Sequence, residues 1–299
     1  MRRLLIIGCG DVARRALPAL QSRYSHVYAL ARSEASASRL RALGVVPIEG
    51  DLDQLRTLRG LAGVAHDVLH SAPPPGEGRV DGRTRNLIAG LARTDHLPQR
   101  LVYLSTTGVY GDCAGERVPE TRPIRPANGR ALRRADAEAR LRAWGQRSRV
   151  AVAVLRVPGI YAADRLPLAR LRQGTPAICA EQDSFSNHVH ADDLARIVVR
   201  ALTSARPGRI YNTSDDSALR MGDWFDLVAD RFGLPRPRRI PRSQAEAEVS
   251  PALLSFMRES RQLVNERLKR ELRIRLRYPT VHSGVADAAR AAGVAAPVA

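Results

Sequence analysis

The chain is poor in lysine, cysteine and aromatic residues. Lys269 is its single lysine, so the formal net charge of +18 is carried by arginine. The three cysteines, Cys9, Cys113 and Cys179, are widely spaced and odd in number, which argues against a disulfide framework and against a cysteine-based metal site. Because aromatic residues make up only 4% of the sequence, we expect a core of Leu, Val, Ile and Ala.

Long apolar runs are also absent. The run Leu4–Ile7 is too short for a signal peptide, and no stretch approaches the length of a membrane span. We therefore expect a soluble, cytoplasmic protein without a membrane partner. The arginines are scattered singly and in pairs, without a dense basic block or interleaved aromatic residues that would stack on bases. This pattern favours solvated helix faces over nucleic-acid binding as the origin of the charge.

Short apolar runs alternate with amphipathic segments through the first two thirds of the chain. This alternation predicts an α/β fold with a doubly wound parallel sheet of the Rossmann type. The expected strands are Arg3–Ile7, His26–Ala31, Val45–Ile48, Asp67–His70, Arg100–Ser105, Val150–Leu155 and Arg209–Tyr211. The expected helices are Asp11–Ser22, Ala35–Leu43, Leu52–Ala62, Val80–Asp95, Gly129–Gln146 and Asp192–Ser204.

Strands become scarce after Asp215. We expect residues 1–162 and 186–214 to form a discontinuous Rossmann domain, and residues 163–185 and 215–299 to form a small, mainly helical lobe on the substrate side. The alanine-rich tail after Gly284 is expected to be either a weak helix or disordered. Helical patterns within the lobe lie at Met221–Phe232, Pro251–Arg258 and Val264–Glu271.

The first expected strand ends in the glycine-rich turn Gly8-Cys9-Gly10-Asp11-Val12. Gly8 and Gly10 permit a tight turn and a close approach of the backbone to a pyrophosphate. The helix that opens with Asp11 and Val12 directs its free N–H groups and positive dipole end toward the phosphates. This turn predicts a dinucleotide site, with a purely structural turn as the alternative.

The end of the second strand indicates which dinucleotide is bound. NAD is usually recognised by an acidic residue about twenty positions after the glycine turn, but Arg32 and Ser33 stand there and suit a 2′-phosphate. Arg14 or Arg15 can assist, whereas Glu34 more often begins the next helix. We therefore expect NADP(H), with NAD as the second choice and chance placement in an arginine-rich chain as the alternative.

Further cofactor contacts are expected where the third and fourth strands end. Asp51, followed by Leu52, is placed either to meet the adenine amino group or to cap the next helix. Ser71, Ala72 and Pro73 are small or rigid residues at the point where the backbone passes beside the cofactor.

Several later motifs run along most of the chain. They are Thr84–Leu87, Ser105–Gly111 with Glu120, Pro123 and Pro126, Leu155–Tyr161, His188–Leu194, Asn265–Leu272 and Tyr278–Thr280. Together they resemble the extended short-chain dehydrogenase/reductase family, the NAD-dependent epimerase/dehydratase group. The resemblance implies a small-molecule substrate, with Ser105 beside the cofactor and Pro158 in the segment that passes the nicotinamide. It also allows a homodimer formed through the helices that flank the fifth strand.

The resemblance fails at the family's catalytic pair. The general acid/base of the family is a tyrosine followed four residues later by a lysine, which lowers the pKa of the phenol. The matching stretch here is 126–134, and the chain has no tyrosine between Tyr110 and Tyr161 and no lysine before Lys269. The standard mechanism is therefore not expected, and the chain looks like the atypical branch of the family.

Partial substitutes for the pair remain. Thr106 matches the serine or threonine that hydrogen-bonds the reacting oxygen in the family. Tyr110 is a second candidate for catalysis, although a tyrosine there more often packs in its turn. Arg130 or Arg133 is a candidate for the ribose contact of the missing lysine, and His188 is a weaker candidate on the wall of the site.

Three functions follow as hypotheses. The first is an NADP(H)-dependent oxidoreductase or epimerase with an unusual proton donor. The second is a non-catalytic NADP(H) sensor that presents its surface to a partner, and the third is a nucleic-acid-binding protein on the same fold. The family's sugar dehydratases place Asp-Glu where Thr107 and Gly108 stand here, so dehydration of a nucleotide sugar is not expected. The sequence indicates no metal site.

Overall fold

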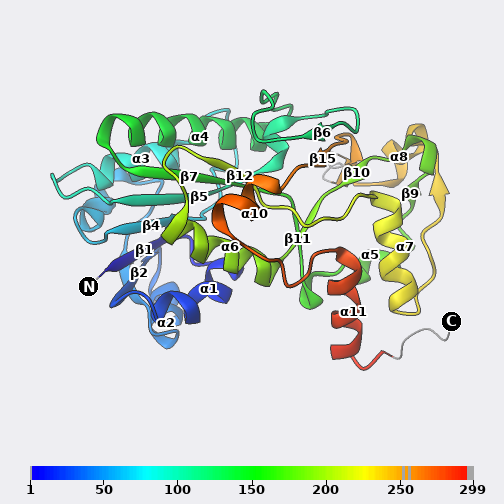
Figure 1. The fold of residues 1–299 in the computed structure, drawn as a ribbon, viewed down its shortest axis with the longest axis horizontal. Coiled ribbons are helices and arrows are strands. Elements are labelled where there is room, and N and C mark those ends of the chain that lie inside the picture. Colours follow the sequence, from blue (N-terminus) through cyan, green and yellow to red (C-terminus); the bar gives the residue numbers. More distant parts are fainter. Residues whose placement is uncertain (1, 251–252, 255–256, 295–299) are drawn as a thin grey trace.

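A computed structural model describes residues 2–250, 253–254 and 257–294. Figure 1 shows a large domain, in which helices flank a parallel sheet, and a smaller lobe beside the carboxyl ends of the strands. The predicted α/β fold with a small C-terminal lobe is confirmed.

The central sheet has seven strands, all parallel, in the order β12-β7-β5-β4-β1-β2-β3. This is the Rossmann arrangement, in which ligands bind outside the carboxyl ends of the strands where the order reverses, here between β1 and β4. The seven predicted strands are confirmed, with ends shifted by two residues at most. They are β1 (Arg3–Ile7), β2 (His26–Ala31), β3 (Val46–Glu49), β4 (Asp67–His70), β5 (Arg100–Thr106), β7 (Ala151–Val157) and β12 (Ile210–Asn212).

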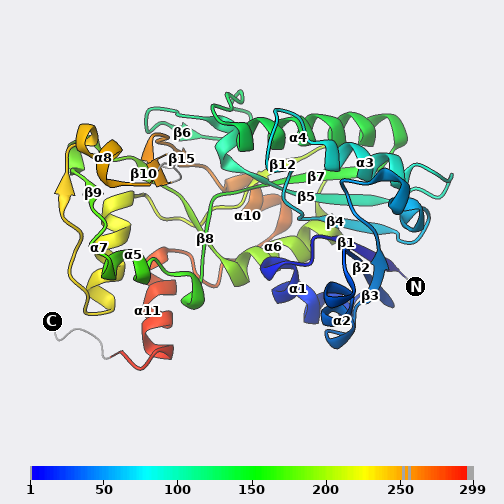
Figure 2. The ribbon, with the colours of Figure 1, turned by 180° about the vertical axis from the view of Figure 1, so that it is seen from behind.

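Helices cover both faces of the sheet, as Figures 1 and 2 show from opposite sides. One face carries α1 (Asp11–Gln21), α2 (Glu34–Ala42) and α6 (Ala191–Ser204), and the other carries α3 (Gly82–Leu91) and α4 (Gly129–Ser148). The helix predicted at Leu52–Ala62 is instead a short 3-10 helix, η1 (Leu55–Leu61).

The alternation of side chains along the strands explains the apolar runs of the sequence. In β1, Leu4 and Ile6 point into the apolar cluster under α1 and α6, whereas Leu5 and Ile7 point into the cluster under α3 and α4. All four side chains are fully buried, as expected for a strand that is covered on both faces.

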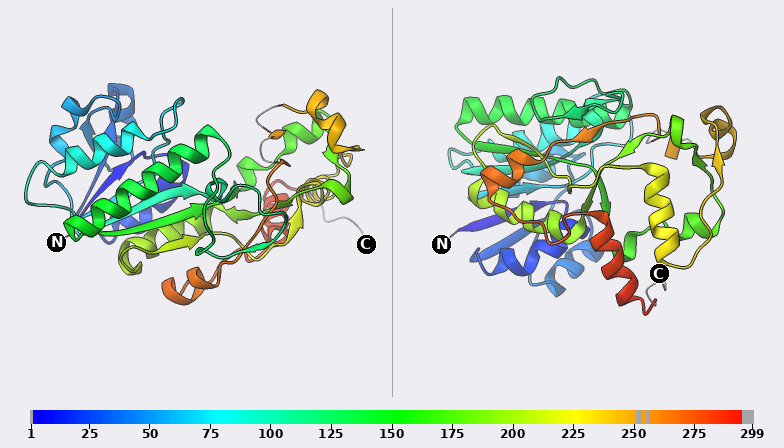
Figure 3. Two further views of the ribbon diagram at one scale, coloured as in Figure 1. Left: turned by 90° about the horizontal axis from the view of Figure 1, so that it is seen from above. Right: turned by 45° about the vertical axis from the view of Figure 1, so that its right-hand side comes forward.

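The small lobe has its own apolar core, which includes Tyr161, Trp224 and Phe225. Figure 3 shows this lobe beyond the carboxyl ends of the sheet strands. The lobe also holds pairs of two-residue strands, which the sequence did not predict because two residues carry no periodic pattern. The lobe contains α5 (Leu168–Arg172), α7 (Met221–Arg231), α8 (Arg242–Glu248), α11 (Val281–Ala291), η4 (Ala180–Gln182), and the pairs β9 (Ala177–Ile178) with β14 (Arg239–Ile240) and β10 (Phe185–Ser186) with β13 (Leu219–Arg220).

The boundary drawn at residue 215 does not follow the packing. Helix α10 (Glu266–Leu272) buries Leu268 and Leu272 in the core cluster of the large domain. The tail after Gly284 continues α11 to Ala291, so the helical alternative holds there, and residues 295–299 lie outside the described residues. The helix predicted at 251–258 also falls partly outside them.

Short elements join the two parts. The strand β6 (Arg117–Val118) pairs with β15 (Gln262–Leu263), and β8 (Gly159–Tyr161) pairs with β11 (His188–His190). The 3-10 turns η2 (Thr107–Tyr110) and η3 (Ala163–Arg165) follow β5 and β8. Within the described ranges, no helix is both long and apolar enough to cross a membrane.

Candidate functional site

The glycine turn brings the ends of β1 and β4 into close contact. Gly8 has a φ of +92°, and a Cβ atom there would lie 2.5 Å from the backbone nitrogen of Ala72, so the position requires glycine. The N–H of Gly10 donates to the carbonyl of Gly8 at 2.9 Å. By contrast, a Cβ atom on Gly10 would meet nothing within 4 Å. Gly8 therefore closes the turn, and Gly10 leaves open space beside it.

Helix α1 begins at this open space with unbonded amides. Gly10 offers no side-chain cap, and the first hydrogen bond of the helix runs from the N–H of Arg14 to the carbonyl of Gly10. The neighbouring helices α2 and α3 are instead capped by Ser33 and Asp81. The free N–H groups of Asp11 and Val12 suit a pyrophosphate, so the residues present fit a dinucleotide.

The carboxylate of Asp11 is neutralised by arginines. Arg15 Nε contacts both of its oxygens at 3.1 Å, and Arg165 contacts it at 3.1 Å. Arg15 also pairs with Asp164 and Asp192, beside a cavity of about 270 Å³ between α1, α6 and α11. Arg15 thus ties α1 to the start of the small lobe. Of the two arginines expected to assist at the phosphate, only the exposed Arg14 keeps its guanidinium free of described partners.

The end of β2 presents a cation. Arg32 is exposed and donates to no described acceptor. Ser33 accepts a hydrogen bond from the N–H of Ser36 and caps α2. Glu34 is the first residue of α2, as expected, and its carboxylate is held by Arg41 at 2.6 Å. The end of β2 therefore carries a free basic side chain, whereas the nearest acidic side chain is already paired.

Asp51 caps a turn and not the next helix. Its carboxylate accepts from the N–H of Asp53 at 2.9 Å, and its own N–H donates to Thr57 Oγ1 at 2.8 Å. Leu52 is buried, and its carbonyl accepts from Asn86 Nδ2. These bonds bend the chain after β3, which explains why η1 starts later and is shorter than the predicted helix.

Ser71, Ala72 and Pro73 form the wall against which the glycine turn packs. The Ser71 hydroxyl donates to the Gly8 carbonyl at 2.6 Å, and Ala72 occupies the space that a side chain at position 8 would need. The Pro73 carbonyl accepts from Arg83 at 3.2 Å. The structure thus brings these three predicted residues to the turn.

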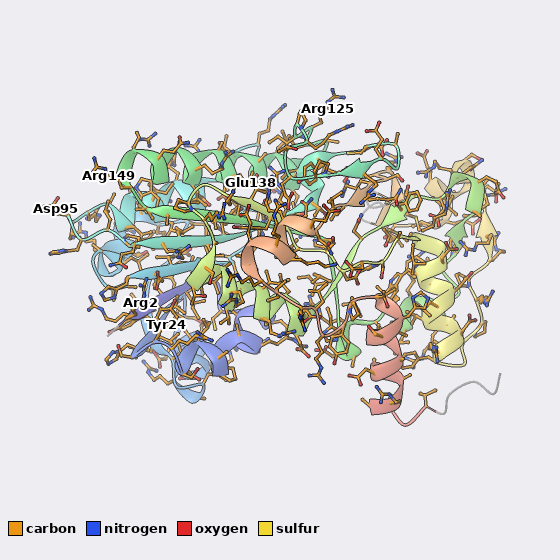
Figure 4. The ribbon with its side chains drawn as sticks, in the orientation of Figure 1. Arg2, Tyr24, Asp95, Arg125, Glu138 and Arg149 are labelled. Atoms are coloured by element: carbon orange, nitrogen blue, oxygen red, sulfur yellow. The ribbon has the colours of Figure 1, made fainter. Side chains whose placement is uncertain are left out.

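Ser105 does not face this site. It is buried, and its hydroxyl donates to Glu138 of α4. Glu138 also pairs with Arg156 of β7 at 2.7 Å, and each of these two side chains is only 4% exposed. Figure 4 shows Glu138 between α4 and the sheet. The Ser105 hydroxyl is therefore bonded within the core, and the cofactor contact expected of Ser105 stays a prediction. Pro158 follows β7 at the carboxyl edge and is half-buried.

The two catalytic candidates differ in what their hydroxyl groups do. Thr106 is half-buried at the end of β5, and its Oγ1 accepts from the N–H of Gly108 at 3.2 Å. No described group accepts the Thr106 hydroxyl proton, which leaves it available. Tyr110 is buried, donates to Asn212 Oδ1 at 2.8 Å, and has a pKa raised by burial. The structure therefore gives Tyr110 a packing role and not that of a proton donor.

Arg134 of α4 reaches the ends of β4 and β5. Its Nη1 donates to the Leu104 carbonyl at 2.8 Å, to the Tyr103 hydroxyl at 3.0 Å and to the Ala72 carbonyl at 3.3 Å. Arg134 thus contacts the residue against which the glycine turn packs. The sequence pattern did not single out Arg134 as a site residue, although Arg130 and Arg134 have the four-residue spacing of the family's tyrosine and lysine.

Two more arginines lie on the first turns of α4. Arg133 donates to the Gly78 carbonyl at 2.6 Å and fastens the loop after β4. Arg130 is exposed as a residue and donates to no described acceptor. Partial desolvation of its guanidinium and the like charges of Arg134 and Arg133 lower its pKa. Of the two residues expected to contact the ribose, Arg133 is thus held by a described acceptor, and the contact itself stays a prediction.

Histidines near the site are enclosed. His188 bonds Ser186 Oγ at 2.9 Å and packs on Trp224, and burial lowers its pKa to about 4. His70 bonds Thr84 Oγ1, and burial lowers its pKa to about 3. Both are therefore neutral core residues at physiological pH. Among the described residues, no group of three or more His, Cys, Asp or Glu side chains is placed to hold a metal ion.

Several known proteins are similar in sequence to part of this chain. A family described as NAD(P)H-binding matches residues 8–205. The chain is 36% identical over 151 residues to a 4-hydroxy-2-methyl-3-oxo-4-farnesyl-3,4-dihydroquinoline-1-oxide ketoreductase of Stigmatella aurantiaca, covering 46% of the chain and 44% of the relative. It is 22% identical over 193 residues to a dTDP-D-glucose 4,6-dehydratase of Mus musculus, covering 62% and 50%. The chain spans about half the length of these curated relatives.

Solved structures match the whole fold. A protein of unknown function from Silicibacter pomeroyi is 27% identical, with a TM-score of 0.78 and coverage of 98% of this chain and 99% of that one. A dTDP-glucose 4,6-dehydratase from Streptomyces venezuelae, with NAD and TYD bound, is 21% identical, with a TM-score of 0.76 and coverage of 96% of both chains. Together with the glycine turn and the strand order, the match over residues 8–205 shows that the chain belongs to the NAD(P)H-binding family, and its fold is the one found in epimerase/dehydratase structures.

Proposed function

We propose that the chain is an NADP(H)-dependent oxidoreductase that interconverts a carbonyl and a hydroxyl group at the carboxyl ends of β4 and β5. The observation that carries this proposal is the free hydroxyl of Thr106 on the same edge as the arginines of α4, next to the glycine turn. The ketoreductase from Stigmatella aurantiaca, which is 36% identical over part of the chain, supports the reaction class.

The first turn of α4 lies against the end of β5. A Cβ atom on Gly108 would lie 3.6 Å from Thr106 Oγ1 and 3.9 Å from the Cβ of Ala131. Ala131 follows Arg130, so the turn of α4 that carries Arg130 begins beside the end of β5, where Thr106 lies.

These residues have complementary roles toward a carbonyl substrate. NADPH, when bound, supplies hydride. The Thr106 hydroxyl donates a hydrogen bond to the carbonyl oxygen, and the guanidinium groups of Arg130 and Arg134 stabilise the negative charge that develops there. A guanidinium does not release its proton at neutral pH, so the oxygen takes its proton from water.

Replacing Thr106 with valine tests the reaction. We expect Thr106→Val to lower the rate of turnover about a hundredfold, the usual effect of losing one donor to an oxyanion. NADPH affinity should stay unchanged because the substitution keeps the shape of the side chain. The measurement is NADPH consumption over a panel of aldehydes and ketones, with Thr106→Ser as the control that retains a hydroxyl. A flat panel for the wild-type protein would refute the proposed activity.

Replacing Arg32 with alanine tests the choice of cofactor. A charge-assisted contact to a 2′-phosphate contributes about 1.5–3 kcal/mol, so Arg32→Ala should weaken NADPH binding roughly tenfold to a hundredfold. NADH binding should not change. Fluorescence titration of both cofactors measures the effect, and Arg39→Ala on the outer part of α2 is the control. Equal affinity of the wild-type protein for NADPH and NADH would contradict the proposed preference.

A non-catalytic NADP(H) sensor is the second candidate. It is favoured by the enclosure of Tyr110, His188 and His70, whose side chains are bonded within the core and so are not placed to exchange a proton with a substrate. Tight NADPH binding, cofactor-dependent protection from proteolysis and no turnover would support the sensor. Equal protection with and without NADPH would count against it.

A further inference from the structure

The side chains of Arg130, Arg133 and Arg134, here called the arginine cluster, concentrate positive charge at the start of α4. Arg133 and Arg134 are only 7% and 8% exposed. Their Nη1 atoms donate to neutral oxygens, and the Nε atom of each is enclosed without a partner. None of the three forms an ion pair with a described carboxylate. Arg130 is exposed, so the cluster joins two buried charges without an ion pair to a third that a ligand can reach.

Buried cations without a counter-charge are costly. The acidic groups nearest along α4 and at the start of α3 are already engaged with other partners. These are Asp81 with Thr84, Asp136 with Arg140, and Glu138 with Arg156. None of these carboxylates forms an ion pair with the cluster, which leaves the cluster able to bind an anion.

The cofactor does not supply that anion in the placement proposed above. Its 2′-phosphate lies at Arg32, on the far side of β1 from α4, and its pyrophosphate lies at the start of α1, where Arg134 reaches only the Ala72 carbonyl behind the glycine turn. The nicotinamide end carries no negative charge and is positive when oxidised. The exposed member of the cluster, Arg130, is therefore left for a negative group of the substrate.

We propose that the arginine cluster binds a carboxylate that the substrate carries next to its reacting carbonyl, so that the substrate class is an oxo acid. Arg130 makes the contact, because its guanidinium has no described partner while Arg133 and Arg134 hold backbone oxygens. A guanidinium binds a carboxylate through two parallel hydrogen bonds. This inference rests on the proposed function, since it places the carboxylate beside the carbonyl that Thr106 contacts.

The test compares benzoate with benzamide, two probes of the same shape that differ in charge. In calorimetric titrations of the NADPH-bound protein, we expect benzoate to bind about tenfold to a hundredfold more tightly than benzamide. Arg130→Gln should remove this difference and leave the dissociation constant of NADPH unchanged. The matched control is Arg142→Gln, an exposed arginine three turns further along α4 that should keep the preference.

Each other outcome decides against the inference. Equal binding of both probes, binding of neither, or a benzoate preference that survives Arg130→Gln overturns it. Competition between benzoate and NADPH would assign the cluster to a cofactor phosphate and would also overturn it. Failure of the proposed function gives a different result from failure of this inference. If only the proposed function fails, the protein binds no NADPH or turns over no carbonyl compound, but the NADPH-free protein still binds benzoate more tightly than benzamide.

Discussion

Gly8→Ala should destabilise the protein and abolish NADPH binding. The new methyl group would lie 2.5 Å from the backbone nitrogen of Ala72 and 2.6 Å from its Cα, and backbone cannot move aside as a flexible side chain can. The φ of +92° adds conformational strain. Together we expect a loss of about 2–5 kcal/mol in the free energy of unfolding and at least a hundredfold loss of NADPH affinity.

Gly10→Ala is the matched control for this position. No atom lies within 4 Å of its Cβ, and its φ is negative, so the melting temperature should stay within about 2 °C of the wild type. The methyl group nevertheless enters the space proposed for the pyrophosphate, so NADPH affinity should fall about tenfold or more. Thermal denaturation and fluorescence titration separate the two effects. Unchanged NADPH affinity in Gly10→Ala would contradict the proposed position of the phosphates.

Glu138→Gln should produce the largest loss of stability expected of a side chain outside the cofactor turn. The substitution leaves Arg156 as a buried charge without its partner, because each side chain of the pair is 4% exposed. Breaking a buried pair from one side costs about 3–5 kcal/mol, or roughly 6–20 °C in melting temperature for a chain of this size. The ion pair also fixes Tyr110, over whose ring the Arg156 guanidinium lies at 4.6 Å.

Two further variants show whether burial of the ion pair causes the loss of stability in Glu138→Gln. Glu116→Gln removes an exposed pair with Arg122 and should cost less than about 1 kcal/mol. The double variant Glu138→Leu with Arg156→Met should recover much of the lost stability, because it removes both charges. Urea denaturation measures all four proteins. A loss for Glu138→Gln no larger than that for Glu116→Gln would show that the pair contributes little.

The strands and the glycine turn could be predicted because they depend on local patterns. Runs such as Leu4–Ile7 are apolar on both faces, and the tight turn before the first helix has a backbone requirement that Gly8 meets with its positive φ. The chain has several such apolar runs separated by amphipathic segments, and this alternation predicts the α/β fold.

The contacts of the side chains at the carboxyl ends of β4 and β5 could not be predicted from local patterns. The side chain of Arg134 meets carbonyl groups that lie 30 and 62 positions away in the sequence, and nothing local distinguishes it from Arg133. Ser105 likewise turns toward Glu138 because strands alternate their faces, and the motif alone does not reveal which face holds the cofactor. The membership of α10 in the large domain depends on where Leu268 and Leu272 find apolar neighbours.

The scarcity of lysine has a practical consequence. Lys269 lies on α10 and pairs with Asp216, a residue of the loop that follows β12. A reagent that reacts with ε-amines would therefore attach a probe to the native chain at one side chain, without any substitution. Since α10 packs on the large domain while the loop after Asp216 enters the small lobe, such a probe would report motion between the two parts.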